Sequence, residues 1–100
     1  MRKIVLLCAA GMSTGMLVIK MREAAKEMNY ECEINAYAVA EANEKAKDAD
    51  FVLLGPQIRF QLDNVKKICG EVPVEAINVQ DYGMMNGKNV IKHVKEELGD

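Results

Sequence analysis

The sequence predicts an α/β fold in which a four-stranded parallel sheet lies between helices on its two faces. Two continuous apolar runs, at residues 4–7 and 51–54, have the composition of strands buried on both faces. Helix-like segments follow the strand-like ones along the whole chain, and such alternation produces parallel sheets with right-handed crossovers. With 100 residues and 50% hydrophobic content, residues 1–100 are expected to form one domain.

The first half of the chain predicts two strand–helix units. After the strand at residues 4–7, apolar residues recur at helical spacing from about residue 13 to residue 28, opposite a charged face. Residues 31–37 alternate apolar with polar side chains, which is typical of a half-exposed edge strand. A short helix rich in Ala, Glu and Lys is expected at residues 41–47.

The second half predicts two more units. The strand at residues 51–54 is stopped by a Gly-Pro pair, and a helix follows that Gly70 ends. Residues 72–79 are expected to form the fourth strand, and the last helix opens at Asn86 or Gly87. Ligands of such sheets bind beyond the carboxyl ends of the strands. Loops at residues 8–14, 55–59 and 80–87 are therefore expected to lie together.

Composition excludes several classes of function. The net charge is −2 with scattered basic residues, so no nucleic-acid partner is expected. The three cysteines are widely spaced without a C-x-x-C pair, which predicts neither a metal site nor a redox pair. The opening "MRKIVLLCAA" lacks the cleavage site of a signal peptide, and no apolar stretch approaches the ~20 residues of a membrane helix. We expect a cytoplasmic protein without a cofactor or direct membrane insertion.

Cys8 is the main candidate for chemistry. It ends the first strand just before a helix N-terminus, where unpaired N–H groups and the helix dipole lower a thiol pKa and attract phosphate. Gly11 permits a backbone turned toward an anion, and Ser13 and Thr14 offer hydroxyls. On spacing alone, a merely buried Cys8 is an equal alternative. The Walker pattern and G-x-G-x-x-G are both absent, so an ATP or NAD site is not indicated.

Three segments, "CAAGMSTGMLVIKM", "DADFVLLGPQIRF" and "VPVEAINVQDYG", resemble the IIB component of the lactose/cellobiose family of the bacterial sugar phosphotransferase system. The resemblance covers essentially the whole chain and implies the parallel-sheet fold found above. It implies that Cys8 takes a phosphoryl group from a phosphohistidine of a IIA partner. The group then passes to a sugar held by the membrane component IIC, such as cellobiose, chitobiose, lactose or a related β-glucoside.

The same resemblance implies a phosphate-binding loop. We also expect a monomer whose partner contacts are transient, because the same face must release IIA before it meets IIC. The residues of this loop are Ala9, Ala10, Gly11, Met12, Ser13, Thr14 and Gly15. Met12 and Met16, with Met84 and Met85 from the third loop, are interpreted as an adaptable apolar surface for two successive partners.

Two alternatives remain open. Low-molecular-weight tyrosine phosphatases have a similar architecture, but their C-x5-R motif has arginine where this chain has Thr14. Asp81 keeps this alternative open, because those enzymes use an aspartic acid from a late loop. The other alternative is a non-enzymatic regulatory module of the same fold. A carrier is favoured because it benefits from lacking groups that assist attack by water.

Other residues with chemical potential are interpreted as structural or solvated. Cys32 and Cys69 are expected to be buried thiols of the core. His93, the only histidine, is expected on the final helix, away from any phosphate-binding loop. Arg59 is expected to be solvated, and Tyr82 either meets a partner or covers the core.

Overall fold

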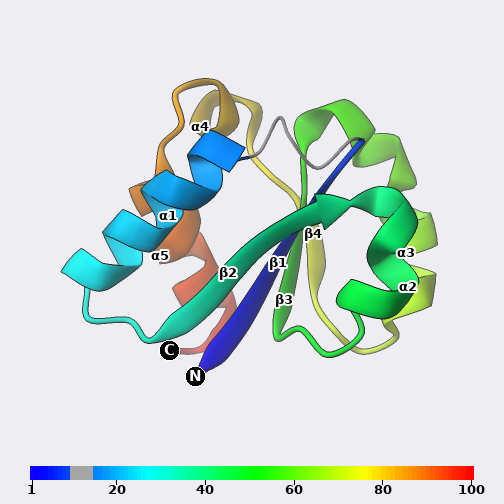
Figure 1. Ribbon diagram of the computed structural model, residues 1–100, viewed down its shortest axis with the longest axis horizontal. Helices are drawn as coiled ribbons and strands as arrows, with labels where there is room; N and C mark the ends of the chain where they lie inside the picture. The colour runs from blue at the N-terminus through cyan, green and yellow to red at the C-terminus, as the bar shows by residue number, and fades with distance from the viewer. Residues whose placement is uncertain (10–14) are drawn as a thin grey trace.

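The computed structural model describes residues 1–9 and 15–100, and its elements alternate between strand and helix (Figure 1). In chain order they are β1 (Arg2–Cys8), α1 (Gly15–Glu27), β2 (Cys32–Ala38), the 3₁₀ turn η1 (Val39–Glu41), α2 (Ala42–Lys45), β3 (Phe51–Leu54), the 3₁₀ segment η2 (Pro56–Gln61), α3 (Leu62–Cys69), β4 (Val74–Ala76), α4 (Val79–Gly83) and α5 (Gly87–Leu98). Within the described ranges, no helix is both long and apolar enough to cross a membrane.

The four strands form one parallel sheet in the order β2-β1-β3-β4. Strand β1 is central, pairing with β2 over its whole length and with β3 from Ile4 to Leu7. The alternating strand β2 lies at an edge, as its pattern predicts. Because all strands run in the same direction, their carboxyl ends meet at one edge of the sheet. The predicted fold class is confirmed.

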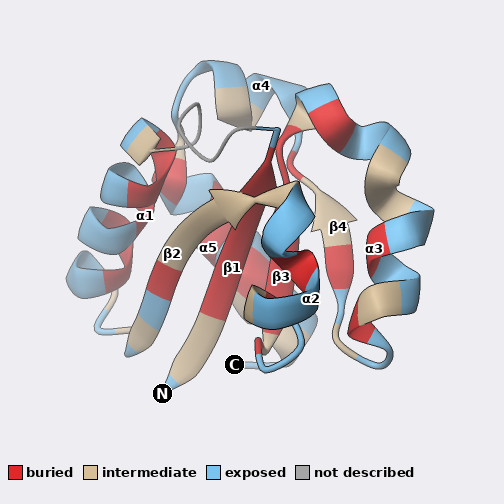
Figure 2. Ribbon diagram, turned by 45° about the vertical axis from the view of Figure 1, so that its right-hand side comes forward, coloured by how far each residue is buried: buried red, intermediate tan, exposed pale blue. Residues whose placement is uncertain are grey.

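Helices cover both faces of the sheet, so the molecule has three layers (Figure 1). On one face, β1 contributes Ile4 and Leu6 to a core completed by α1 and α5. On the other face, β1 contributes Val5 and Leu7 to a core completed by α2 and α3. Strands β1 and β3 are almost entirely buried between the two helical layers, as Figure 2 shows.

The sequence prediction is wrong about the segment after the fourth strand. Strand β4 spans only Val74–Ala76, not residues 72–79, and residues 79–83 form helix α4 where a loop was expected. The side chain of Asn78 accepts hydrogen bonds from the backbone N–H groups of Gln80 and Asp81. This N-cap satisfies donors of the first turn and starts the helix directly after the strand.

Several other boundaries differ by a few residues. The helix expected between the Gly-Pro pair and Gly70 begins as the 3₁₀ segment η2, with Pro56 in its first turn, and becomes α-helical at Leu62. The helix expected at residues 41–47 begins earlier, as η1, and ends at Lys45. Gly70 terminates α3 with φ of 66°, as its position predicts, and Asn86 caps α5.

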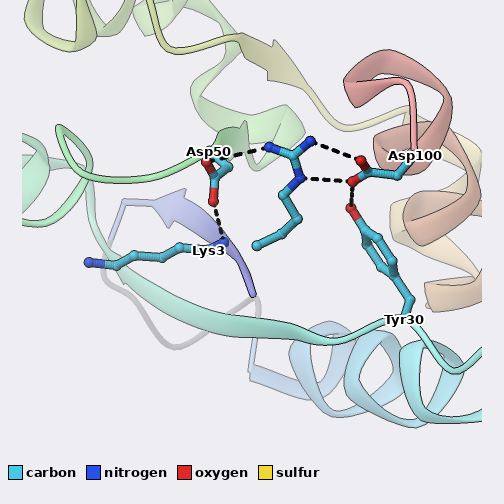
Figure 3. Close-up of polar contacts among 5 residues, drawn as sticks. Lys3, Tyr30, Asp50 and Asp100 are labelled. Carbon is cyan, nitrogen blue, oxygen red and sulfur yellow. Dashed lines mark hydrogen bonds and ion pairs between the residues drawn. The ribbon is translucent and has the colours of Figure 1, made fainter.

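A polar network joins the two ends of the described chain (Figure 3). The guanidinium of Arg2 donates two hydrogen bonds of 2.8 Å to the carboxylate of Asp100, which also accepts one from the Tyr30 hydroxyl. Asp50 accepts a hydrogen bond of 2.8 Å from the backbone N–H of Lys3 and lies 3.7 Å from the Arg2 guanidinium. These contacts hold the amino end of β1, at the far end of the sheet from its carboxyl edge.

Candidate functional site

Cys8 is the last residue of the central strand, so the sheet fixes its backbone on both sides. It pairs with Ala38 of β2, and on the other side the N–H of Gly55 donates to the carbonyl of Leu7 at 2.9 Å. Cys8 is only 1% exposed, whereas Ala9 is exposed and begins the turn away from the sheet. A rigid strand therefore holds the candidate nucleophile at the carboxyl edge of the sheet.

The candidate phosphate loop lies only partly within the described residues. Ala9 and Gly15 are described, and Gly15 is already the first residue of α1. Ala10, Gly11, Met12, Ser13 and Thr14 lie outside the described residues. The thirteen-residue helix α1 carries no acidic side chain in its first turn, so no carboxylate there opposes an anion at its N-terminus.

Gly55 is a neighbour of Cys8, in the segment at residues 55–59 that the sequence places beside the loop after the first strand. A Cβ atom placed on Gly55 would lie 3.7 Å from the Cβ of Cys8 and 3.7 Å from the carbonyl oxygen of Leu7. Gly55 therefore lies next to the cysteine, at a separation that would also accommodate a Cβ atom; the tight contact of such an atom, at 3.0 Å, would be with Oε1 of Gln57. The signal for this contact was the alignment of the two buried runs, because paired parallel strands bring their ends together.

The third predicted loop contributes Asp81 and Tyr82, both on α4. The carboxylate of Asp81 accepts a hydrogen bond from the side-chain amide of Asn89 on α5, at 3.2 Å. Tyr82 is half-buried and packs against the core formed by α1 and α5. These contacts support a structural role for both side chains, in holding α4 against α5.

Exposed apolar side chains occur on several elements next to the carboxyl edge, among them Phe60 of η2, which is 77% exposed. Met16 and Ile19 of α1 are 52% and 47% exposed, and Val79 and Met84, on and just after α4, are 61% and 76% exposed. The N-terminal end of α1 and α4 lie at the same end of the molecule in Figure 1. Met85 is 43% exposed. Three of the four methionines proposed as a partner surface are therefore exposed, and Met12 lies outside the described residues.

The remaining two cysteines have the environments expected of structural thiols. Cys69 is buried in the core beneath α3, and Cys32 is half-buried at the start of β2. Burial raises the pKa of both thiols above the ordinary value, because a thiolate is poorly solvated there. Neither environment favours a nucleophile at neutral pH.

His93 and Arg59 are both exposed, as expected. The imidazole of His93 lies 2.6 Å from the carboxylate of Glu75 on β4. This hydrogen bond, and then the negative charges of Glu75, Glu97 and Glu96, raise the pKa of His93 above its ordinary value. Sequence reasoning missed this pairing, because eighteen residues separate the two side chains.

Comparison with known proteins identifies relatives over nearly the whole chain. The family model of the lactose/cellobiose-specific IIB subunit of the phosphotransferase system (PTS) matches residues 3–93. The oligo-β-mannoside-specific EIIB component of Bacillus subtilis is 42% identical over 90 residues, covering 88% of this chain and 87% of that one. The galactose-specific EIIB component of Lactococcus lactis subsp. cremoris is 45% identical over 96 residues, covering 88% of each chain.

Solved structures agree with this result. The solution structure of a cellobiose-specific IIB component from Borrelia burgdorferi is 41% identical, with a TM-score of 0.74, over 91% of this chain and 85% of that one. The lactose-specific IIB domain of Streptococcus pneumoniae superposes with a TM-score of 0.80 over 95% of both chains. At 19% identity, the latter supports the fold alone. The chain belongs to the lactose/cellobiose-specific IIB family and is a phosphotransferase component of a sugar phosphotransferase system.

Proposed function

We propose that this chain carries a phosphoryl group on Cys8 during sugar uptake, between a phosphorylated IIA protein and a sugar bound by a membrane IIC component. The observation that carries the proposal is the position of Cys8. It ends the central strand of a IIB fold, and the chain from there enters the N-terminal end of α1. An anion at this point meets the positive end of a helix and the exposed edge of a parallel sheet.

Two in-line displacements describe the transfer. The Cys8 thiolate attacks the phosphorus of phosphohistidine, so that an S–P bond forms while the N–P bond breaks. The IIA imidazole keeps that electron pair and takes up a proton. A sugar hydroxyl oxygen then attacks the same phosphorus, the S–P bond breaks, and the thiolate is regenerated as the hydroxyl proton is released.

The phosphate-binding residues are proposed to be residues 9–15, through their backbone N–H groups and the hydroxyls of Ser13 and Thr14. Support comes from the flanks of this segment. The absence of an acidic residue from the first turn of α1 leaves the helix dipole unopposed. On the other side of Cys8, Gly55 adds no side chain that could fill the space next to the thiol.

A carrier is favoured over a phosphatase by two features. Thr14 stands where a phosphatase of this architecture has the arginine that stabilises the transferring phosphoryl group. The carboxylate of Asp81, the candidate general acid, is engaged by the amide of Asn89. A phosphocysteine here would keep its phosphoryl group long enough to meet a second protein.

The partners and setting are part of the same proposal. Residues 1–100 are proposed to act as one IIB domain, as a monomer in the cytoplasm. Relatives are named for oligo-β-mannoside, galactose and cellobiose. We propose a substrate of the same class, a β-linked disaccharide or a related β-glucoside such as cellobiose, chitobiose or lactose.

Intact mass spectrometry after incubation with a phosphorylated IIA protein tests the proposal. The wild-type chain should gain one phosphoryl group, Cys8→Ser should gain none by this route, and Cys32→Ser should behave like the wild type. A phosphoryl group still gained by Cys8→Ser would contradict the assignment. Rapid turnover of an aryl phosphate by the wild type would favour the phosphatase instead.

A further inference from the structure

A cluster of side chains away from Cys8 connects the edge strand β4 to helix α5. His93 Nε2 lies 2.6 Å from Glu75 Oε1, between these two elements. Glu97 follows His93 by four residues, so both side chains lie on one face of α5. One ligand atom from each of these three residues lies within 4.8 Å of the other two. The fold thus brings one imidazole and two carboxylates together.

We propose that Glu75, His93 and Glu97 bind a first-row divalent cation, and that Zn²⁺ is the ion this donor set suits. Imidazole nitrogen and carboxylate oxygen bind Zn²⁺ at ~2.0–2.2 Å, which puts two ligands of a tetrahedral ion roughly 3.4 Å apart. The ligand atoms of His93 and Glu75 are 2.6 Å apart, and those of all three residues lie within 4.8 Å of one another. The separation needed for a tetrahedral ion falls between these two distances. The side chains of His93 and Glu75 are 47% and 36% exposed, so they have room to rotate into place.

A cavity adjoins two of the three residues of the cluster, Glu75 and His93. It has a volume of about 330 Å³, and Glu75 and His93 line it together with Asn78 and Asp81. Three protein ligands leave a position of a four-coordinate ion open. That position would face a space large enough for water, with further oxygen-bearing side chains within it.

The charges around the cluster also favour a cation. Glu96, beside Glu97 on α5, is close enough to act electrostatically on His93. Lys95, from the same turn, is directed elsewhere, because its ammonium group lies over the ring of Tyr30, 5.2 Å from the centroid. Three carboxylates, those of Glu75, Glu96 and Glu97, therefore act electrostatically on His93.

This site is separate from Cys8, so the inference does not rest on the proposed function. Glu75 pairs with Leu53 of β3, which pairs with Leu6 of β1. Two inter-strand spacings of ~4.8 Å therefore put Glu75 roughly 10 Å from β1. Along the strand direction it is level with Leu6, which precedes Cys8 on β1. A cation here would link the three-residue edge strand β4 to α5, a stabilising role rather than a catalytic one.

Titration of the metal-free, full-length protein with Zn²⁺ tests the site, with calorimetry and histidine side-chain NMR as the two measurements. His93 is the only histidine, so its Nε2 resonance reports on this position alone. We expect binding tighter than about 0.1 mM, and a displaced Nε2 resonance at saturation. Thermal shift is unsuitable, because Zn²⁺ also binds the cysteines of the unfolded chain.

Three variants make the result specific. His93→Gln and Glu97→Gln should each weaken Zn²⁺ binding by about 10-fold or more. Glu96→Gln removes the same charge one residue away and should weaken it no more than about 2-fold. Circular dichroism checks that each variant is folded. Zn²⁺ binding unchanged in His93→Gln, equal losses in Glu96→Gln and Glu97→Gln, or an Nε2 resonance that does not move would each overturn the proposal.

Discussion

At the residue scale, the carboxylate of Asp100 shows how hydrogen bonds from two side chains change the pKa of an acidic group. The side-chain hydrogen bonds from Arg2 and then from Tyr30 lower the pKa of Asp100 from 3.8 to about 2. Conversely, burial and the hydrogen bond to Asp100 raise the pKa of the Tyr30 phenol above its ordinary value. Figure 3 shows the three groups in contact. Folding therefore favours the ionised form of Asp100.

We predict that Asp100→Asn lowers the melting temperature at pH 7 and that this difference disappears in acid. A lowered pKa in the folded state stabilises the protein above the unfolded pKa of 3.8, and the contribution fades as pH falls through about 2. Thermal unfolding from pH 7 to pH 2 measures the difference between wild type and variant. The same change at exposed Asp48 is the control. A difference that stays constant down to pH 2 would contradict this explanation.

Cys8 gives the other residue-scale conclusion. Its position at the end of a strand, beside the segment at residues 55–59, was readable from the sequence, whereas the individual contact with Gly55 was not. Gly55 packs against it because β1 and β3 pair in register, so that their final residues lie side by side. These two neighbours in space stand 47 positions apart in the sequence.

At the element scale, the packing of α1 against α5 depends on one glycine. Gly87 is the first residue of α5 and is buried against the backbone of α1. A Cβ atom there would lie 2.4 Å from the carbonyl carbon of Lys20 and 2.5 Å from the backbone nitrogen of Met21. Such close approach to backbone is possible only without a side chain.

We predict that Gly87→Ala lowers the free energy of unfolding by about 1–3 kcal/mol, because the two helices must move apart. Gly83→Ala is a matched control, since a Cβ atom at Gly83 meets no atom within 4 Å. That variant should be neutral or more stable by up to about 1 kcal/mol. Urea unfolding of both variants measures the effect. Equal stability of the two variants would show that the helices are not in tight contact.

The short elements after the strands are where sequence reasoning was least accurate. Helix α4 was expected as a loop because its five residues carry no helical apolar period. The Asn78 cap and the packing of Tyr82 on the core stabilise it instead. A short helix gains its stability from capping and tertiary contacts of this kind, which cannot be recognised from the spacing of apolar residues in the sequence.

At the scale of the whole molecule, exposed apolar side chains gather at the end that holds Cys8. Met84 is the most exposed of the methionines on α1 and after α4, at 76%. Exposed apolar side chains that form a contiguous patch mark surfaces that meet other proteins. This arrangement supports a docking surface for the partners proposed above.

We predict that Met84→Gln raises the KM for phosphorylated IIA by about 10-fold, the size of effect expected from one apolar contact at an interface. Met84→Leu keeps the apolar area and should stay within about 2-fold of the wild type. Both variants should retain the wild-type melting temperature, because the side chain is exposed. Steady-state transfer assays supply the KM values. Indistinguishable kinetics for Met84→Gln and the wild type would exclude this side chain from the interface.

The sequence by itself determined the fold class, the central and edge strands, the two helical layers and Cys8 as the candidate nucleophile. These features depend on local periodicity and on the order of strands and helices. Both can be read directly from neighbouring residues in the sequence. The tertiary structure alone decided the contacts between distant residues: Asp100 with Arg2, Gly87 with Lys20, and Glu75 with His93. Those contacts follow from strand order and helix docking, which bring together side chains whose pairing leaves no pattern in the sequence.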